Sequence, residues 1–303
     1  MSNVPIKGVD VYQSSSQFIY QFLISLAVYI NPRGLARIIR SQPEHSATTS
    51  INATHVSYLR FAHHQGLPMA GGGEGELKLL GVWTSPFVIR VRVVLNLKSL
   101  PYEYVEENLG SKSALLLGSN PVHQSVPVLL HGGRPVNESQ VIVQYIDEVW
   151  AGVGPSVLPA DPYERAVARF WAAYVDDKVG SAWTGMLFSC KTEEERAEAV
   201  SRAVAALETL EGALAECSGG NPFFGGDAIG FVDVVLGGYL GWFGAIDKII
   251  GRRLIDPART PLLARWEERF RAADAAKGVV PDDADKMLDF LPTLLAWIAS
   301  KAK

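Results

Sequence analysis

The sequence has few cysteines, no excess of basic residues and no long apolar run, and each shortage argues against a class of protein. Only Cys190 and Cys217 occur in 303 residues, so we expect no disulfide framework and a reducing, cytoplasmic compartment. No apolar run approaches the about 18 residues of a membrane span, so no membrane partner is expected. The formal net charge of −4 argues against a nucleic-acid partner, because non-specific phosphate binding relies on a basic surface. The chain is 48% hydrophobic and long enough for two domains of ordinary size.

The first 68 residues differ from the rest in composition. They hold five basic and two acidic residues, a net charge of +3, which leaves −7 for the remainder. Three interpretations are open: a signal peptide around "FIYQFLISLAVYI" (18–30), a weak organelle transit peptide, or an upstream extension of a chain whose translation naturally starts at Met69. Lys7 is a poor basic lead-in and no small-x-small cleavage site follows, which argues against the signal peptide. The third interpretation is favoured. We therefore expect residues 1–75 to form a disordered leader or a non-native extension.

From Glu76 onward the hydrophobic pattern predicts regular elements. A strand is expected over 76–83, a helix over 86–98, a second strand over 102–108, a short helix over 111–118, a hairpin over 126–139 and a helix over 139–150. A parallel βαβ pair followed by a hairpin and a covering helix is typical of a thioredoxin-like domain. We expect such a domain, with the order βαβαββα, over 76–151.

A linker rich in glycine and proline, "AGVGPSVLPAD" (151–161), separates this domain from a helical one. Asp161, Pro162 and Glu164 supply an N-cap, a first-position proline and a third-position glutamate, which together predict a helix start. Helices are expected over 162–190, 193–217, 230–249, 260–273 and 283–300. The fold class is therefore α+β: a thioredoxin-like domain followed by an all-α bundle over 162–303.

The residues Thr84-Ser85-Pro86 stand where the first strand gives way to the first helix. A serine before a first-position proline caps a helix, and capping alone would explain it. However, the free amides and the positive dipole end of a helix N-terminus also favour an anion. Glu138 and Ser139 stand at a second helix start, and the topology brings both starts to one edge of the sheet. An anion-binding site is therefore expected there.

The segment "VPV" adds an extended stretch beside these helix starts. The backbone of Val126 is available to a peptide, and Pro127 is a candidate cis-proline in a tight turn.

Several stretches together resemble the plant tau-class glutathione transferases. They are "WTSPFVIRVR", "NPVHQSVPVLLHGGRPVNESQVIVQYIDEVW", "LPADPYERAVARFWAAYVDDK", "NPFFGGDAIGFVDVVLG" and "DKMLDFLPTLLAW". The likeness covers about 76–300 and leaves the first residues out.

The resemblance implies an enzyme of detoxification and stress response that conjugates the thiolate of glutathione to electrophilic apolar compounds and can also reduce organic hydroperoxides. It implies glutathione as co-substrate, no metal or other cofactor, and a homodimer. A non-catalytic carrier of apolar metabolites remains the alternative, because it needs the same apolar cleft. A glutathione-dependent thiol oxidoreductase ranks lower, since such relatives carry cysteine where Ser85 stands.

The resemblance also implies residue roles. Ser85 would be the catalytic residue, its hydroxyl donating to the glutathione sulfur. Lys112 would pair with the glycyl carboxylate, the Val126 backbone would bond the cysteinyl moiety, and Glu138 and Ser139 would hold the γ-glutamyl amine and carboxylate. One departure stands out: this chain has Gln124 and Ser125 where relatives carry lysines, which removes positive charge near the glycyl carboxylate.

Aromatic residues are the candidates for the apolar substrate site. Trp83 and Phe87 are expected on the near side, and Tyr174, Trp183, Phe188 and Trp242 on the helical side. Aromatic residues at helical spacing are more often core, so each of the four competes with that simpler explanation.

We predict that the leader is dispensable, because no family motif enters before Glu76 and the glycines at 71–73 would decouple what precedes them. A chain starting at Met69 should fold, bind glutathione and turn over as well as the full chain, and limited proteolysis should digest residues 1–68 first. Loss of the melting transition or of activity on truncation would contradict this.

Overall fold

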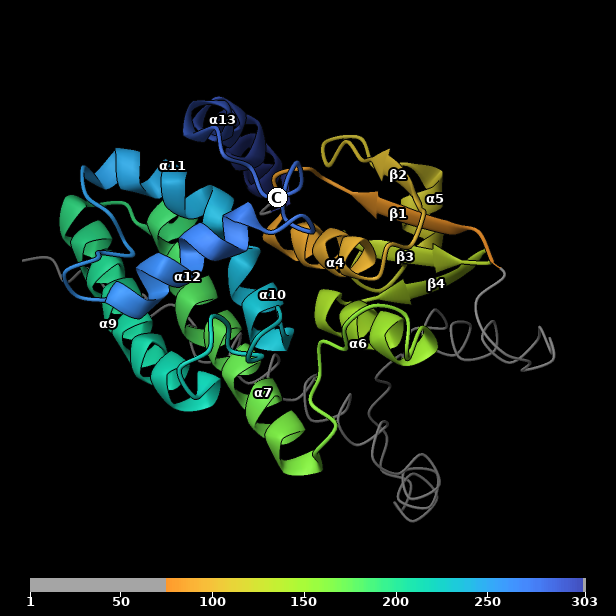
Figure 1. Cartoon of the computed structure of the whole chain (residues 1–303). Helices are drawn as coiled ribbons and strands as arrows, with labels where there is room; N and C mark the ends of the chain where they lie inside the picture. Colours follow the sequence, from red (N-terminus) through yellow and green to blue (C-terminus); the bar gives the residue numbers. More distant parts are fainter. Residues whose placement is uncertain (1–74, 302–303) are drawn as a thin grey trace, which may run out of the picture. The chain divides into compact units, whose positions relative to one another are not determined.

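The computed structural model describes residues 75–301 of the chain (Figure 1). The predictions for the leader fall on residues 1–74 and lie outside the described residues. Within the described part, no helix is both long enough and apolar enough to cross a membrane.

A four-stranded sheet forms the first part of the described chain. Its elements are β1 (Leu77–Gly81), α4 (Pro86–Leu97), β2 (Glu103–Glu106), α5 (Ala114–Ser119), β3 (Val128–His131), β4 (Arg134–Asn137) and α6 (Ser139–Val149). The strand order is β2-β1-β3-β4, with β1 parallel to β2 and β3 antiparallel to both of its neighbours. This is the predicted thioredoxin-like βαβαββα order.

Alternating strand residues bury both faces of this sheet. Leu79 and Leu129 belong to the cluster that holds the buried residues of α4 and α6. Leu80 and Val128 point to the other face, where they pack with Leu116 of α5. Helices α4 and α6 therefore share one face of the sheet, and α5 covers the other (Figure 1).

The rest of the described chain is helical, as predicted. Its elements are α7 (Pro162–Tyr174), η1 (Val175–Gly180), α8 (Ser181–Thr184), η2 (Gly185–Ser189), α9 (Glu193–Ser218), α10 (Phe231–Gly237), α11 (Leu240–Ile250), α12 (Pro261–Ala272) and α13 (Ala284–Lys301). The predicted cap of α7 is present, since Asp161 accepts hydrogen bonds from the backbone N–H groups of Tyr163 and Glu164, both at 2.9 Å.

Two predicted helices are interrupted. The expected helix over 162–190 contains the π-helical segments η1 and η2, and the expected helix over 230–249 divides into α10 and α11. The spacing of apolar residues does not reveal either change, because a π-turn adds only one residue to an otherwise helical segment. The helix divides at a close contact: a Cβ on Gly238 would lie 2.5 Å from the Pro86 carbonyl oxygen, so glycine lets the chain approach the start of α4.

Asp233 holds the loop before α10. Its carboxylate accepts hydrogen bonds from the backbone N–H groups of Phe224 (2.9 Å), Gly225 (3.0 Å) and Gly230 (2.8 Å) and from the indole of Trp266 (2.7 Å). Burial raises the pKa of this carboxyl to about 6, and the four N–H donors oppose that rise.

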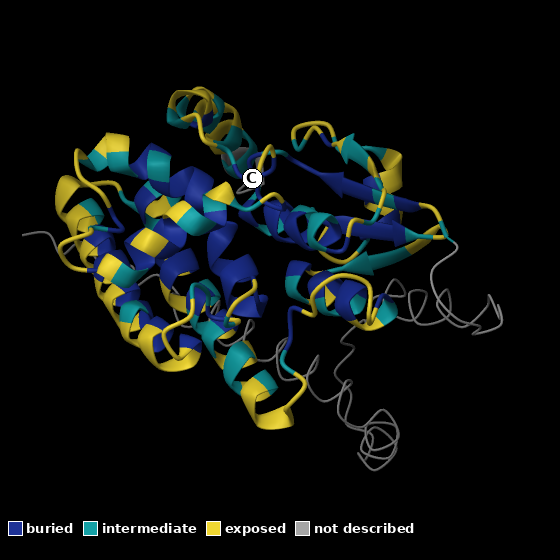
Figure 2. Cartoon of the chain, viewed as in Figure 1, coloured by how far each residue is buried: buried dark blue, intermediate teal, exposed yellow. Residues whose placement is uncertain are grey.

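One hydrophobic cluster runs from α4 and α6 into the helical part of the chain (Figure 2). The charged side chain of Arg90 in α4 is fully buried within this region. Its Nη1 and Nη2 donate to the two carboxylate oxygens of Asp176 in η1, with Nη1 at 3.1 Å, and its Nε donates to the Val235 carbonyl at 3.2 Å. Gln140 (2.7 Å) and Tyr239 (3.0 Å) also donate to Asp176. The pair therefore joins α4 to three helical segments.

We predict that Asp176→Ala lowers the free energy of unfolding by about 3 kcal/mol, because it leaves the buried Arg90 charge without its partner. Asp177→Ala is the matched control, since Asp177 is the next residue and pairs with Lys178 at the surface, where such pairs contribute about 1 kcal/mol or less. Urea unfolding of both variants measures the difference, and equal destabilisation would contradict the role given to Asp176.

Candidate active site

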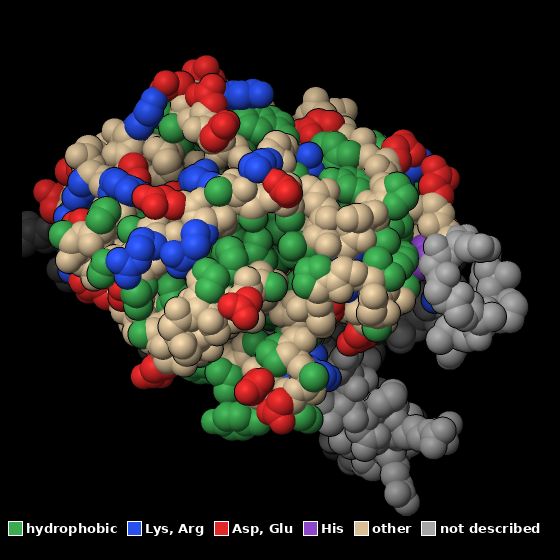
Figure 3. Space-filling view, viewed as in Figure 1, with side chains coloured by type: hydrophobic (Ala, Val, Ile, Leu, Met, Phe, Trp, Pro, Cys, Tyr) green, Lys and Arg blue, Asp and Glu red, His purple; other side chains and the backbone are tan. Residues whose placement is uncertain are grey.

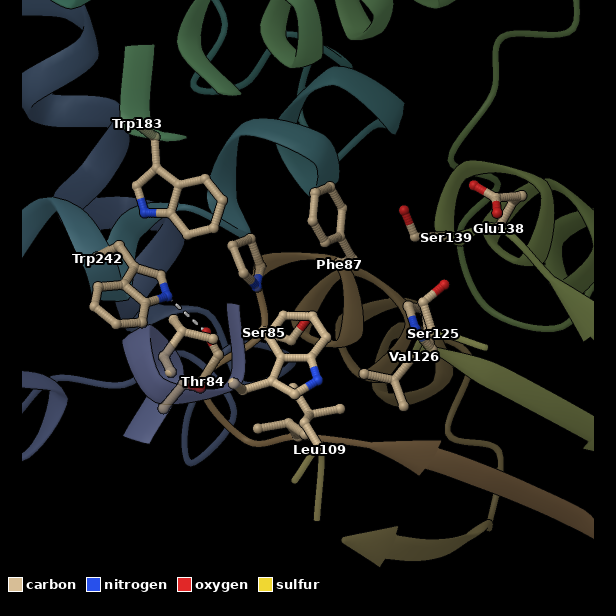
Figure 4. Close-up of a pocket in the computed structure, with 15 residues that line it drawn as sticks. Thr84, Ser85, Phe87, Leu109, Ser125, Val126, Glu138, Ser139, Trp183 and Trp242 are labelled. Carbon is tan, nitrogen blue, oxygen red and sulfur yellow. Dashed lines mark hydrogen bonds between the residues drawn. The ribbon is translucent and has the colours of Figure 1, made fainter. Parts of the chain in front are cut away.

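A cavity of about 270 Å³ lies where the start of α4 meets the helical part of the chain. Figure 4 shows the arrangement of its residues: Glu138 and Ser139 lie on one side, Trp183 and Trp242 on the other, and Ser85 and Phe87 between them. The full lining is Val82, Thr84, Ser85, Pro86, Phe87, Leu109, Ser125, Val126, Pro127, Glu138, Ser139, Trp183, Trp242, Leu294 and Trp297.

Ser85 is the N-cap of α4, and Pro86 occupies the first helical position, as the sequence indicates. The Ser85 hydroxyl accepts a hydrogen bond from the Val88 backbone N–H, but at 3.4 Å this bond is long. Accepting that bond leaves the hydroxyl proton available to donate. No acidic residue lies in the first turn of α4 to offset the positive end of the helix dipole. The start of α4 therefore offers a hydroxyl donor in a site that favours negative charge.

The Val126–Pro127 peptide bond is cis, as predicted for Pro127. Both residues line the cavity directly before β3. Among residues 75–301, the backbone N–H and carbonyl of Val126 have no hydrogen-bond partner, so an extended peptide can bond them.

Glu138 and Ser139 form the start of α6, the second helix N-terminus at the cavity. Glu138 has a positive φ of 72°, which non-glycine residues rarely adopt, and its side chain makes no capping bond. Its carboxylate is exposed and lies 3.9 Å from His123 Nε2. Ser139 is buried, and its hydroxyl accepts a hydrogen bond from Arg90 Nη1 at 3.3 Å. The buried arginine thus donates to both Asp176 of η1 and this serine.

Lys112 lies just before α5 and does not line the cavity. Its Nζ donates to the Gln124 carbonyl at 2.7 Å, and it lies 5.9 Å from the ring centroid of Trp297. The Lys112 side chain therefore contacts both the segment before Val126 and helix α13.

Three of the six aromatic residues proposed for the apolar site line the cavity: Phe87, Trp183 and Trp242. Trp242 is fixed by a 2.8 Å hydrogen bond from its indole N–H to the Thr84 carbonyl (Figure 4). Trp183 packs against Trp242, with ring centroids 6.1 Å apart.

The other three aromatic residues lie elsewhere. Trp83 packs edge-on against Phe290 with ring centroids 5.8 Å apart. Phe188 packs edge-on against Trp183, with ring centroids 5.3 Å apart, and does not line the cavity. Tyr174 lines a different cavity, together with Lys178 and Arg202.

Sequence reasoning missed Leu109, Leu294 and Trp297 as cavity residues. The latter two belong to α13, about 200 positions after Ser85 in the chain. Their spacing fits the apolar side of an amphipathic helix, so no local signal separates them from core residues.

Tyr239 lies next to the aromatic lining and contacts the Arg90–Asp176 pair. Burial is the main cause that raises its pKa, and the neighbouring Asp176 raises it further. The phenol therefore keeps its proton and donates to Asp176 at 3.0 Å. Within the described residues, no group of three or more His, Cys, Asp or Glu side chains could hold a metal ion.

Comparison with known proteins agrees with this arrangement. Residues 75–148 match the glutathione S-transferase N-terminal domain, and residues 193–269 match the glutathione S-transferase C-terminal domain. A probable glutathione S-transferase of rice (Oryza sativa subsp. japonica), GSTU6, is 82% identical over 76% of this chain and 99% of its own length. Glutathione S-transferase U17 of Arabidopsis thaliana is 48% identical over 71% of this chain and 94% of its own.

Solved structures give the same result. The tau-class glutathione S-transferase of mango (Mangifera indica) superposes with a TM-score of 0.68 and is 48% identical over 73% of this chain and 98% of its own. Rice GST1 in complex with glutathione gives a TM-score of 0.66 and 40% identity over 74% of this chain and 98% of its own. The predicted fold and family are confirmed: this chain belongs to the tau class of the glutathione transferases.

Proposed function

We propose that glutathione binds across the starts of α4 and α6 and that its thiolate attacks an electrophilic apolar compound in the same cavity. One observation carries this proposal: a single cavity is lined by Ser85, Glu138 and Ser139 and also by Phe87, Trp183 and Trp242. A sulfur placed at Ser85 would lie between the polar and the aromatic sides (Figure 4). The two reactants would then meet without either leaving its own subsite.

The proposed role of Ser85 is to stabilise the thiolate. A free thiol has a pKa of about 8.5 and is mostly protonated at neutral pH. Each unit by which the pKa falls requires about 1.4 kcal/mol of preference for the charged form. A charge-assisted hydrogen bond from the Ser85 hydroxyl and the N-terminus of α4 can together supply one to two such units.

The remaining polar groups suit the other parts of the tripeptide. The exposed Glu138 carboxylate suits the γ-glutamyl ammonium, and the Ser139 hydroxyl and amide at the start of α6 suit the γ-glutamyl carboxylate. The Val126 backbone suits the cysteinyl moiety. Lys112 is the cation proposed for the glycyl carboxylate, and with Gln124 and Ser125 beside it we expect weaker glutathione binding than in relatives that carry lysines there.

The aromatic lining favours an apolar, electrophilic second substrate. The same cavity supports a second proposed reaction, the reduction of organic hydroperoxides. The thiolate would attack the outer oxygen and release an alcohol, leaving the sulfur as a sulfenic acid. A second glutathione would then displace hydroxide from that sulfur, so that two thiols yield one disulfide and one water.

We predict that Ser85→Ala lowers turnover at least 10-fold, on the order of 1.4 kcal/mol, because the thiolate loses its hydroxyl donor. The turnover rates measured with 1-chloro-2,4-dinitrobenzene and with cumene hydroperoxide should fall by the same factor. Calorimetry should show that glutathione binding is retained.

Thr192→Ala is the control for lost capping, since Thr192 caps α9 with a 3.2 Å bond to the Glu195 N–H and lies outside the cavity. It should lose stability but keep its turnover. Wild-type activity in Ser85→Ala would remove the hydroxyl from the mechanism.

We further propose that residues 76–151 act as the glutathione-binding domain and residues 162–303 as the domain that holds the apolar substrate. The segment between α6 and α7, without helix or strand, supports this division. A cytoplasmic location is proposed as well, which the two free cysteines support.

The enzyme is proposed to be a homodimer, with the thioredoxin-like domain of one subunit packed on the first helices of the other's bundle. Large apolar side chains lie exposed on the two elements concerned: Tyr163 (77%) and Phe170 (60%) on α7 and Val141 (52%) on α6. Apolar atoms gather at the exposed end of α7 in Figure 3. Such exposed apolar groups favour a protein interface.

We predict that Phe170→Asp converts the dimer to monomer, because it places a charge in a buried apolar interface. Light scattering at micromolar concentration should give about twice the 32.9 kDa chain mass for the wild type. Ile249→Asp is the control, an equally apolar exposed residue (42%) on α11, and should stay dimeric. A monomeric wild-type protein would contradict the proposal.

A further inference from the structure

Helix α13, at the end of the described chain, contacts the thioredoxin-like part through aromatic rings and ammonium groups. Lys286 of α13 lies 4.8 Å from the ring centroid of Trp83, and Phe290 packs edge-on against the same indole. About two helical turns after Phe290 the roles reverse. Trp297 of α13 supplies the ring, and Lys112, whose Nζ lies 5.9 Å from the ring centroid, supplies the ammonium. Both distances lie within the range of cation–π attraction.

Only the second of these contacts reaches the cavity. Trp297 lines it together with Ser85 and Val126, whereas Lys286 and Trp83 do not. Trp297 joins the rings of Phe87, Trp183 and Trp242 around the same space. Four aromatic side chains around about 270 Å³ suit a flat aromatic ligand better than a branched aliphatic one.

Lys112 connects the Trp297 indole to the polar side of the site. An ammonium has three donors, and one of them is used on the Gln124 carbonyl at 2.7 Å. A second donor remains for a carboxylate while the ammonium still lies near the indole. The Lys112 side chain is half-buried, so part of its rotamer freedom remains to be lost when a ligand binds it.

We propose that Trp297 couples the two substrate sites: glutathione held at Lys112 fixes the Trp297 ring, and the fixed ring completes the surface against which a flat aromatic electrophile binds. This inference rests on the proposed function at one point, the contact of Lys112 with the glycyl carboxylate. Once glutathione has ordered Lys112, the aromatic ligand no longer bears that ordering cost, so binding is cooperative. The coupling is reciprocal, and each ligand tightens the other by the same factor.

The test uses N-phenyl-1-naphthylamine, a neutral, flat aromatic probe that does not react with thiols. Its Kd is measured by fluorescence on the full chain, without glutathione and at saturating glutathione for each variant. In the wild type, glutathione should tighten probe binding about 5-fold or more. Trp297→Leu and Lys112→Met should each reduce this factor to about 1, and the double variant should show no further loss. Trp297→Phe keeps a ring and should retain part of the coupling.

Lys286→Met is the matched control, because it removes the other ammonium–indole contact of the same helix without touching the cavity. It should keep the wild-type coupling. Persistence of the full factor in Trp297→Leu, or its loss in Lys286→Met, overturns the inference.

The same titrations separate this inference from the proposed function on which it rests. If the glutathione Kd of Lys112→Met equals that of the wild type, the proposed glycyl contact is wrong. If glutathione binding weakens in Lys112→Met while glutathione still tightens probe binding in Trp297→Leu, the proposed glycyl contact is supported. The proposed role of Trp297 is then wrong.

Discussion

The structure around the cavity depends on one buried charge. Arg90 extends from α4 into the interior and is neutralised by Asp176 of η1. A guanidinium without its partner would be strongly unfavourable there, so α4 and η1 are held at one separation. Since Ser85 caps the start of α4, the same pair sets how far the Ser85 hydroxyl lies from the helices that carry the aromatic lining. Arg90 also donates to Ser139, the first residue of α6, so one side chain helps to position both helix starts at the cavity.

The aromatic side of the cavity is tied to the backbone as well as to its own neighbours. The Trp242 indole donates to the carbonyl of Thr84, the residue directly before Ser85. A buried indole N–H needs such a partner, and here the partner is the turn that presents the hydroxyl. Exchange of Trp242 for an aliphatic residue would therefore alter the turn as well as the lining.

Of the polar residues expected from the sequence, Ser85, Glu138 and Ser139 line the cavity and Lys112 does not, whereas the sequence was insufficient for much of the apolar side. Ser85 and Ser139 follow from local signals, because strand-to-helix junctions carry recognisable capping residues and a βαβ topology brings them to one edge. Trp83, Phe188 and Tyr174 carry the same aromatic signal as Trp183, yet only Trp183 lines the cavity. Helical spacing places a ring on a face but does not tell whether that face meets a cavity or the core. The contribution of α13 depends on contacts between distant segments and has no local signature.

The fold also restricts how this site can change. At Gly238 a Cβ would lie 2.5 Å from the carbonyl of Pro86, so backbone meets backbone where α10 and α11 divide. A side chain at that position would force the two segments apart and shift the start of α4 with them. The depth of the cavity is thus set by main-chain contact, whereas its outline is set by exchangeable rings such as Phe87 and Trp183. New substrate ranges can therefore arise by replacing rings alone, with the reacting sulfur kept at a constant depth.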